Sequence, residues 1–122
     1  MRLYETKWFV RYARREQIDD SALRESIGRA ERGLVDADLG GGIIKQRVAR
    51  TGQGRSSGFR VIIAYRSGNR AVFLYGFAKS EQANIDEADL QTLRELGAVW
   101  LNAGQEGLDH AIEEGILKEV VP

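Results

Sequence analysis

The 122-residue sequence contains no cysteine and only one histidine, one methionine and one proline. Without cysteine there is neither a disulfide framework nor a thiolate nucleophile. The single histidine, His110, cannot form a catalytic pair of histidines, and we expect it at the surface. No group of His, Asp and Glu has the spacing of metal ligands, and no nucleophile motif such as G-x-S-x-G is present. The sequence therefore predicts a protein that uses no metal ion and no other cofactor.

Long apolar runs are also missing, and the sequence is charged from Arg2 onward. We therefore expect neither a secretory signal nor a membrane span, and a cytoplasmic location. With 43% hydrophobic residues, a chain of 122 residues is long enough to bury one core. We predict a single domain over residues 1–122, with an acidic C-terminal extension over residues 104–122.

Acidic residues are absent from the middle third of the chain. Residues 41–80 carry 8 basic and 0 acidic side chains, whereas residues 1–40 carry 8 of each sign and residues 81–122 carry 2 basic and 10 acidic. The net charge of zero thus hides a strong segregation. The central cations are Lys45, Arg47, Arg50, Arg55, Arg60, Arg66, Arg70 and Lys79.

Two interpretations of this segregation are open. The acidic C-terminal third can pack against the basic segment and neutralise it, or the basic segment can bind a polyanion such as nucleic acid. A purely structural network would intersperse the two signs more evenly. The segregation therefore favours a functional basic surface.

Local patterns predict four helices. Thr6 is a suitable N-cap for a helix over residues 7–16, in which Trp8, Phe9 and Tyr12 form an apolar stripe that we expect in the core. A second helix, preceded by the capping residues Asp19, Asp20 and Ser21, runs to about residue 32 and makes a helical hairpin with the first. Asp86 can cap a third helix over residues 87–102, and residues 107–115 form a short acidic helix.

The basic segment itself reads as strands over residues 43–49, 59–65 and 71–77, because β-branched and aromatic residues alternate there with breaks rich in glycine, serine and asparagine. The period of two places Lys45, Arg47 and Arg60 on one surface if the first two strands pair as a hairpin. We expect this sheet to be half-buried. Residues 2–5 are expected to form a short edge strand, residues 34–42 a loop and residues 116–121 a final strand.

The segment between the first two of these strands, Thr51–Gly58, combines three glycines with Arg55. Glycines at 52, 54 and 58 free the backbone to point N–H groups at an anion. The segment lacks the G-x-x-x-x-G-K-[ST] fingerprint of a nucleoside triphosphate site. Together with the flanking cations, it predicts contact with a phosphodiester.

Three motifs follow one another along the basic segment: K-x-R-V-A at residues 45–49, G-x-G-[KR]-S-x-G-[FY]-R at residues 52–60 and F-x-Y-[GA]-F-x-K-x-E-x-x-N-I at residues 73–85. With the preceding ERGLVDADLGGG at residues 31–42, they resemble the RelE/HigB branch of bacterial toxin–antitoxin toxins. The resemblance covers about residues 6–100.

The resemblance implies a compact α+β domain, in which an N-terminal helical hairpin packs on a twisted antiparallel sheet that is followed by a C-terminal helix. It implies a ribosome-dependent endoribonuclease that cuts translated mRNA in the decoding site. It also implies a cognate helix-turn-helix antitoxin that neutralises the toxin and represses the operon, so that operator DNA is reached only through the antitoxin.

Metal-free RNA cleavage needs an activated 2′-hydroxyl, a stabilised phosphorane and a protonated 5′-oxygen. Arg60 and Lys79 are the first candidates, because each lies in its own motif, and Lys79 is a candidate for moving protons. The other catalytic candidates are Lys45 and Arg47 for the phosphate and Tyr75 and Glu81 for acid or base. The candidates for binding RNA phosphates are Arg50, Gly52, Gly54, Arg55 and Arg66.

One departure concerns proton transfer. Better-known members of the family carry a tyrosine or histidine near the end of the C-terminal strand, where this sequence reads FAKSE at residues 77–81. Two other functions stay open on the sequence. One is a ParE-like toxin that poisons DNA gyrase by binding, and the other is a non-toxic regulatory relic, because a fold alone does not separate these activities.

Overall fold

The computed structural model of the protein describes residues 1–49 and 58–121. Its elements follow the chain as β1 (Arg2–Thr6), α1 (Lys7–Glu16), α2 (Asp20–Glu31), β2 (Ala37–Gly40), β3 (Ile43–Val48), β4 (Phe59–Arg66), β5 (Arg70–Ala78), α3 (Glu87–Asn102), α4 (Gln105–Glu113) and β6 (Leu117–Val120). The architecture is α+β, as the sequence predicts. Among the described residues we find no helix with the length and hydrophobicity needed to cross a membrane.

The helix starts agree with the capping residues of the sequence. Thr6 accepts a hydrogen bond from the N–H of Phe9 at 3.2 Å, and α1 begins at Lys7. Asp19 caps α2 through the N–H of Ala22 at 2.9 Å. Asp86 caps α3 in the same way through Asp89 at 2.8 Å. Side-chain oxygens that satisfy the first free N–H groups fix the start of each helix.

The sheet is mixed, in the order β2-β3-β4-β5-β1-β6. β1 pairs with β5 in parallel and with β6 antiparallel, so the prediction of an edge strand at residues 2–5 is wrong. The five residues of β1 are too few for their sequence pattern to show that this strand has a neighbouring strand on each side. The predicted loop at residues 34–42 is also incomplete, because Ala37–Gly40 forms the edge strand β2 beside β3.

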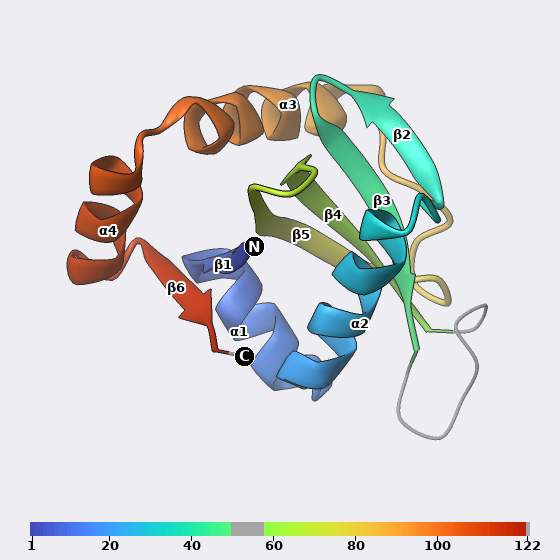
Figure 1. The fold of residues 1–122 in the computed structure, drawn as a ribbon. Coiled ribbons are helices and arrows are strands. Elements are labelled where there is room, and N and C mark those ends of the chain that lie inside the picture. Colours follow the sequence, from blue (N-terminus) through green and yellow to red (C-terminus); the bar gives the residue numbers. More distant parts are fainter. Residues whose placement is uncertain (50–57, 122) are drawn as a thin grey trace.

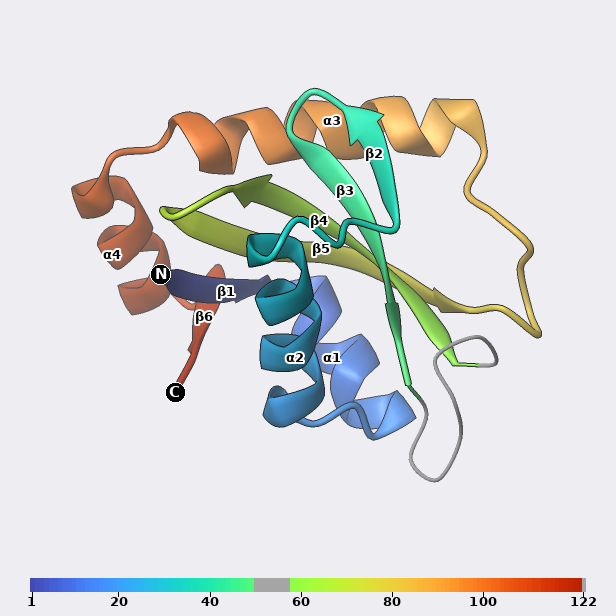
Figure 2. The same cartoon turned by 45° about the vertical axis from the view of Figure 1, so that its right-hand side comes forward.

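Both faces of the sheet are covered by helices (Figure 1). On one face, Phe9 of α1 and Leu23 of α2 share a core cluster with Val61 and Phe73 of the central strands. On the other face, α3 packs over Ile62 and Val72, as the turned view shows (Figure 2). The prediction of a half-buried sheet is therefore wrong: Ile62 and Ala64, on the face expected to be solvated, are both 0% exposed.

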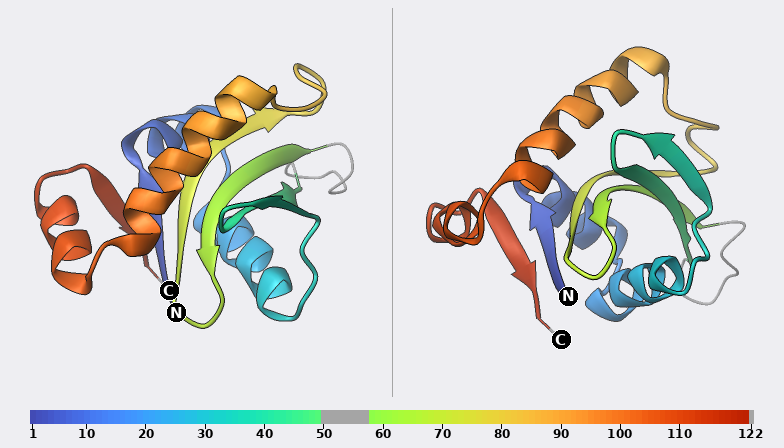
Figure 3. Two further views of the ribbon diagram at one scale, coloured as in Figure 1. Left: turned by 90° about the horizontal axis from the view of Figure 1, so that it is seen from above. Right: turned by 45° about the horizontal axis from the view of Figure 1, so that its top comes forward.

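α2 and α4 lie on different sides of the molecule, whereas α1 lies next to β6, where Val10 and Leu117 line one groove. Seen from above, α3 runs along the central strands, with α4 and β6 beyond its C-terminal end and α2 on the opposite side of the sheet (Figure 3). The apolar stripe of α1 is only partly buried. Phe9 and Tyr12 are buried, but Trp8 is 44% exposed, so the prediction of a core position for Trp8 is wrong. Trp8 lies in the first turn of the helix, beside the end of β1.

A close approach at Gly97 determines how tightly α3 packs on the sheet. A Cβ atom at this position would lie 2.4 Å from Cδ1 of Ile43 and 3.3 Å from Cβ of Ala64. Only a residue without a side chain allows the helix backbone to come so near two neighbouring strands.

Replacement of Gly97 by leucine is expected to lower the free energy of unfolding by roughly 3 kcal/mol or more, because overpacking outweighs the better helix propensity. Urea denaturation measures the loss. Gly107→Leu in α4 is the control, since the nearest atom to a Cβ there is Ala103 Cβ at 3.7 Å. Equal stability of the two variants would contradict this packing.

Candidate nucleic-acid interface

The register of β3 and β4 places two arginines directly opposite each other. Arg47 pairs with Arg60, and Lys45 pairs with Ile62 two residues along. Because side chains alternate between faces with a period of two, Lys45, Arg47 and Arg60 share one face of the sheet. The predicted shared surface for these three cations is thus confirmed, and the register has not slipped.

β5 continues the same two rows across the sheet. Phe77 pairs with Arg60, and Tyr75 pairs with Ile62. Lys79 follows the last residue of β5, and its N–H donates to the carbonyl of Gly58 at 3.2 Å, which ties it to the start of β4. Phe77 thus lies next to Arg60 on the same face, and the ring of Tyr75 packs against Trp8 of α1, with the ring centroids 4.7 Å apart.

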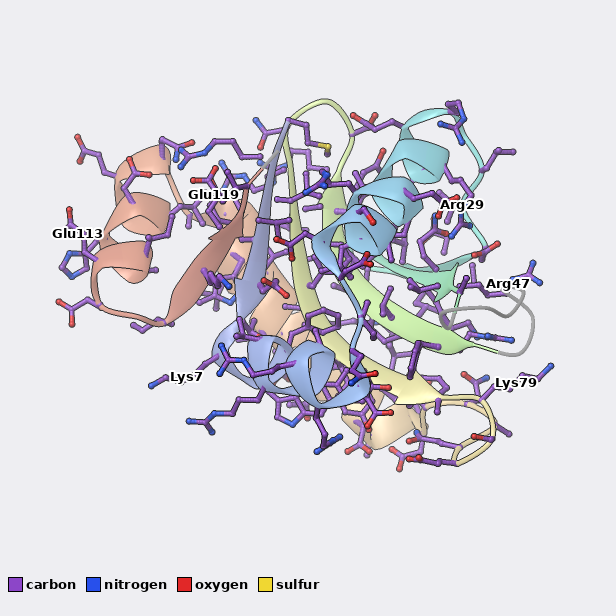
Figure 4. The ribbon with its side chains drawn as sticks, turned by 90° about the horizontal axis from the view of Figure 1, so that it is seen from below. Lys7, Arg29, Arg47, Lys79, Glu113 and Glu119 are labelled. Carbon is purple, nitrogen blue, oxygen red and sulfur yellow. The ribbon has the colours of Figure 1, made fainter. Side chains whose placement is uncertain are left out.

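We refer to Lys45, Arg47, Arg60 and Lys79 as the cationic cluster. The labelled side chains of Arg47 and Lys79 lie on one side of the molecule, whereas Lys7 and Glu119 lie on the opposite side, near β6 (Figure 4). Arg47 and Lys79 are exposed, and Lys45 and Arg60 are half-buried. Residues from three strands or strand ends therefore bring positive charge to one end of an otherwise covered sheet.

The Arg47 side chain is held by a carboxylate that precedes β2. Asp36 accepts a hydrogen bond from the backbone N–H of Arg47 at 2.6 Å and forms an ion pair with its guanidinium at 3.3 Å. The other partner of Asp36 is Arg29 of α2, at 3.2 Å, and Arg29 also donates to the carbonyl oxygen of Arg47. One carboxylate thus bridges two guanidinium groups, and Arg29 has Glu25 as a second acidic partner at 2.9 Å.

The pKa of Asp36 reports this environment. Burial raises the pKa, but the hydrogen bond from the Arg47 N–H and the bond and charge of Arg29 outweigh burial, so the pKa lies below its ordinary value. Nothing in the sequence LVDADLGGG singles out Asp36, because the pairing depends on how β2 folds back along β3. Sequence reasoning therefore missed this residue.

The lowered pKa of Arg60 agrees with its position opposite Arg47 in the strand register. Burial lowers the pKa of the Arg60 guanidinium, and the nearby charge of Arg47 lowers it further, while Asp36 acts in the opposite direction. An arginine stays charged despite such a shift. The charge of Arg47 is thus the second cause of the lowered pKa after burial, and an anion bound between the two side chains would offset it.

The connection from β5 to α3 closes one side of the cluster. Lys45 donates from Nζ to Oδ1 of Asn84 at 3.4 Å, and the hydroxyl of Tyr75 donates to Oε1 of Gln82 at 3.4 Å. Glu81 is exposed in the same connection. Of the two acid–base candidates, Glu81 is two residues from Lys79 in the chain. Tyr75 shares a face of the sheet with Lys45 and Arg60.

Other predicted residues lie elsewhere. Arg66 is at the opposite end of β4 from Arg60, about 20 Å along the strand at 3.3 Å per residue. Arg70 is buried and donates to the carbonyls of Trp100 and Ala103, so it caps the C-terminal end of α3. The phosphate-binding candidates Arg50, Gly52, Gly54 and Arg55 lie outside the described residues.

Within the described residues, carboxylates of the C-terminal third pair with arginines outside the cluster. Within residues 1–49 and 58–121, Asp109 and Glu119 pair with Arg2, and Glu87 pairs with Arg94. No ion pair in these ranges joins a C-terminal carboxylate to Lys45, Arg47 or Lys79. The interpretation of the basic segment as a functional surface is therefore favoured over internal neutralisation.

The cluster can bind a phosphodiester, because arginine forks match phosphate oxygens and lysines add point charges. Among the described residues, no group of three or more His, Asp and Glu side chains is placed to hold a metal ion. The imidazole of His110 is exposed, as predicted, and faces Glu114 at 3.5 Å on α4.

The family model of the RelE toxin of the RelE/RelB toxin–antitoxin system matches residues 1–120. The chain belongs to the RelE toxin family. The match runs through α4 and β6, well beyond the residues on which the motifs rest. A comparison with curated proteins finds no match. Membership in the RelE family implies a cognate antitoxin as partner.

In this RelE-family toxin, Asp36→Asn is expected to lower the free energy of unfolding by about 2–3 kcal/mol at pH 7, because charge-assisted bonds to two arginines are weakened. The folded-state pKa of Asp36 is lowered, so its stabilisation is present above the ordinary aspartate pKa of about 3.9 and is lost as the pH falls through the folded value.

Urea denaturation between pH 7 and pH 3 tests both parts: the stability difference between Asp36→Asn and wild type is expected to shrink towards acid pH. Asp38→Asn is the control, since Asp38 accepts only the N–H of Gly40 among its described neighbours. A difference that is independent of pH would show that the charge of Asp36 is not what stabilises β3.

Proposed function

We propose that this toxin is a ribosome-dependent endoribonuclease that cleaves translated mRNA without a metal ion. The observation that carries the proposal is the gathering of Lys45, Arg47, Arg60 and Lys79 at one end of the sheet. A site of this composition favours a polyanion, and membership in a toxin family makes RNA the substrate to test first.

The reaction proposed is internal transesterification. The 2′-oxygen forms a bond to phosphorus and gives its proton to a general base, while the bond from phosphorus to the 5′-oxygen breaks and this oxygen takes a proton from a general acid. The products are a 2′,3′-cyclic phosphate and a 5′-hydroxyl end. The reaction consumes no water and changes no oxidation state, so it requires neither a cofactor nor a co-substrate.

The proposed roles follow from position and charge. Arg47 and Arg60, opposite each other on β3 and β4, hold the non-bridging oxygens of the phosphorane, whose extra negative charge relieves their repulsion. Lys45 and Lys79 flank the phosphate. Tyr75 and Glu81 are the proposed groups for proton transfer, with Lys79 as a further candidate for the 5′-oxygen.

We base the proposed dependence of RNA cleavage on the ribosome on the solvent exposure of the cationic cluster. Arg47 is 48% exposed, and Lys79 is exposed, so both can reach a phosphate on a large particle. Cations on an exposed face bind any phosphodiester and do not by themselves orient the 2′-hydroxyl for in-line attack. We propose that the ribosome supplies this orientation by holding the mRNA in the decoding site.

The partners proposed with this function are the translating ribosome with its mRNA and a helix-turn-helix antitoxin. The antitoxin neutralises the toxin and carries it to operator DNA, which the toxin itself does not contact. This activity belongs in the cytoplasm, where translation takes place.

Arg60→Ala is expected to reduce the rate of mRNA cleavage by about 10²–10³-fold, as expected for loss of one group that stabilises transition-state charge, and Arg60→Ala/Lys79→Ala to abolish growth arrest. Primer extension on transcripts from induced cells maps the cuts. Arg32→Ala is the control, because Arg32 is exposed at the end of α2, away from the cluster.

Three results would contradict the proposal. Intact transcripts in growth-arrested cells would remove the nuclease. DNA breaks with induction of the SOS response would favour a gyrase poison, and normal growth with the wild-type protein would favour a non-toxic regulatory protein.

A further inference from the structure

A second charged surface lies at the other end of the molecule, on α1. Lys7, Arg11 and Arg14 occur at positions i, i+4 and i+7 and so form one stripe along the helix. All three are exposed, and no carboxylate in residues 1–49 or 58–121 lies within ion-pair distance of them. Like charges at this spacing destabilise a helix by a few tenths of a kcal/mol per pair, so an external anion is the natural counterpart.

The stripe forms one wall of a groove between α1 and the C-terminal elements. The groove has a volume of about 570 Å³ and an apolar floor made by Val10, Ile112 and Leu117. Its only acidic lining residue, among those described, is Glu119, which Arg2 binds through two hydrogen bonds of 2.7 and 2.9 Å. The groove therefore offers positive charge above an apolar surface.

An apolar second groove adjoins the first, and Lys7 lines both. The second groove has a volume of about 360 Å³. Three large apolar side chains that the fold leaves exposed line it: Trp8 at 44%, Leu96 at 37% and Ile116 at 48%. Exposed apolar groups gathered beside unpaired cations are typical of a protein interaction site.

We propose that these two grooves together are the docking surface for the cognate antitoxin, which inserts an acidic amphipathic segment. Its apolar side chains fill the floor between α1, α4 and β6, and its carboxylates pair with Lys7, Arg11 and Arg14. The stripe spans about 10 Å at 1.5 Å per residue, which matches two turns of a partner helix lying in the groove.

Charge and hydrophobicity together select a protein over an RNA. An RNA backbone would pair with the three cations but would leave the apolar floor and the exposed Trp8, Leu96 and Ile116 in water. An acidic amphipathic segment pairs its carboxylates with the three cations and also buries the apolar side chains of both grooves. Lys7 lies on the opposite side of the molecule from Arg47 and Lys79 (Figure 4), so an antitoxin bound along the stripe does not contact these two cations. The second groove extends as far as Tyr75, and a segment that fills it contacts this residue of the proposed RNA site.

The test is the affinity of the full-length toxin for the purified antitoxin encoded beside it, measured by calorimetry. Lys7→Glu/Arg11→Glu is expected to weaken binding at least 30-fold and Leu96→Ser/Ile116→Ser at least 10-fold. The matched control Arg24→Glu/Arg32→Glu makes the same charge change on α2 and is expected to alter affinity less than threefold. Circular dichroism checks that every variant is folded.

Hydrogen exchange on the wild-type complex provides a measurement free of mutations. The antitoxin is expected to slow exchange in residues 7–14 and 115–119. Protection confined to β3, β4 and the end of β5 would overturn the proposal, as would wild-type affinity in Lys7→Glu/Arg11→Glu. Loss of ribosome binding in this variant with unchanged antitoxin binding would make the surface a contact for ribosomal RNA instead.

The proposal does not depend on the nuclease activity, because its measurements are of binding. Cleavage by Lys7→Glu/Arg11→Glu in the absence of antitoxin is expected to equal that of wild type, while the same variant co-expressed with antitoxin still arrests growth. If the toxin cuts no RNA, the binding measurements still decide where the antitoxin docks.

Discussion

The pairing of Arg47 with Arg60 across β3 and β4 is the contact on which the rest of the site depends. Two like charges opposite each other on neighbouring strands destabilise a sheet. Burial lowers the pKa of Arg60, and the charge of Arg47 lowers it further. The fold tolerates the pair because Asp36 binds Arg47 from the outer edge of β3, and because this end of the sheet is open. The same repulsion makes the pair receptive to a phosphate. The pairing of Arg47 with Arg60 thus lowers the stability of the free protein, but it supplies the positive charge that the proposed reaction uses.

The charges of the molecule are divided between separate tasks. The acidic C-terminal third brings the net charge to zero. In the part of the chain that the structure describes, Asp109 and Glu119 pair with Arg2, Glu87 pairs with Arg94, and none of these carboxylates forms an ion pair with Lys45, Arg47 or Lys79. The covered faces of the sheet keep Ile62 and Val72 out of water, so that only its end presents cations. On the opposite side of the molecule, the stripe on α1 adjoins the exposed apolar side chains of Trp8, Leu96 and Ile116. This difference is why we assign RNA to one surface and a protein to the other.

Much of this arrangement was predictable from the sequence, because it depends on local rules. The caps Thr6, Asp19 and Asp86 gave the helix starts, and the period of two in β3 and β4 gave the shared face of Lys45, Arg47 and Arg60. The features that were missed depend on partners distant in space. β1 is too short for its pattern to reveal neighbours on both sides, and α3 buries a face whose flanking arginines look solvated. Helical spacing grouped Trp8 with Phe9 and Tyr12, yet only the packed structure shows that Trp8 contacts Tyr75 of β5 and stays 44% exposed.

The central claim is that one RNA phosphate lies between Arg47 and Arg60. The most direct measurement is the structure of the toxin on a ribosome programmed with mRNA whose 2′-hydroxyls are methylated, which blocks the attack and traps the uncleaved substrate. The account predicts non-bridging oxygens of one phosphate within about 3 Å of both guanidinium groups, with Lys79 on the side of the 5′-oxygen. A decoding-site phosphate that contacts neither arginine, or an mRNA that lies along α1, would contradict it.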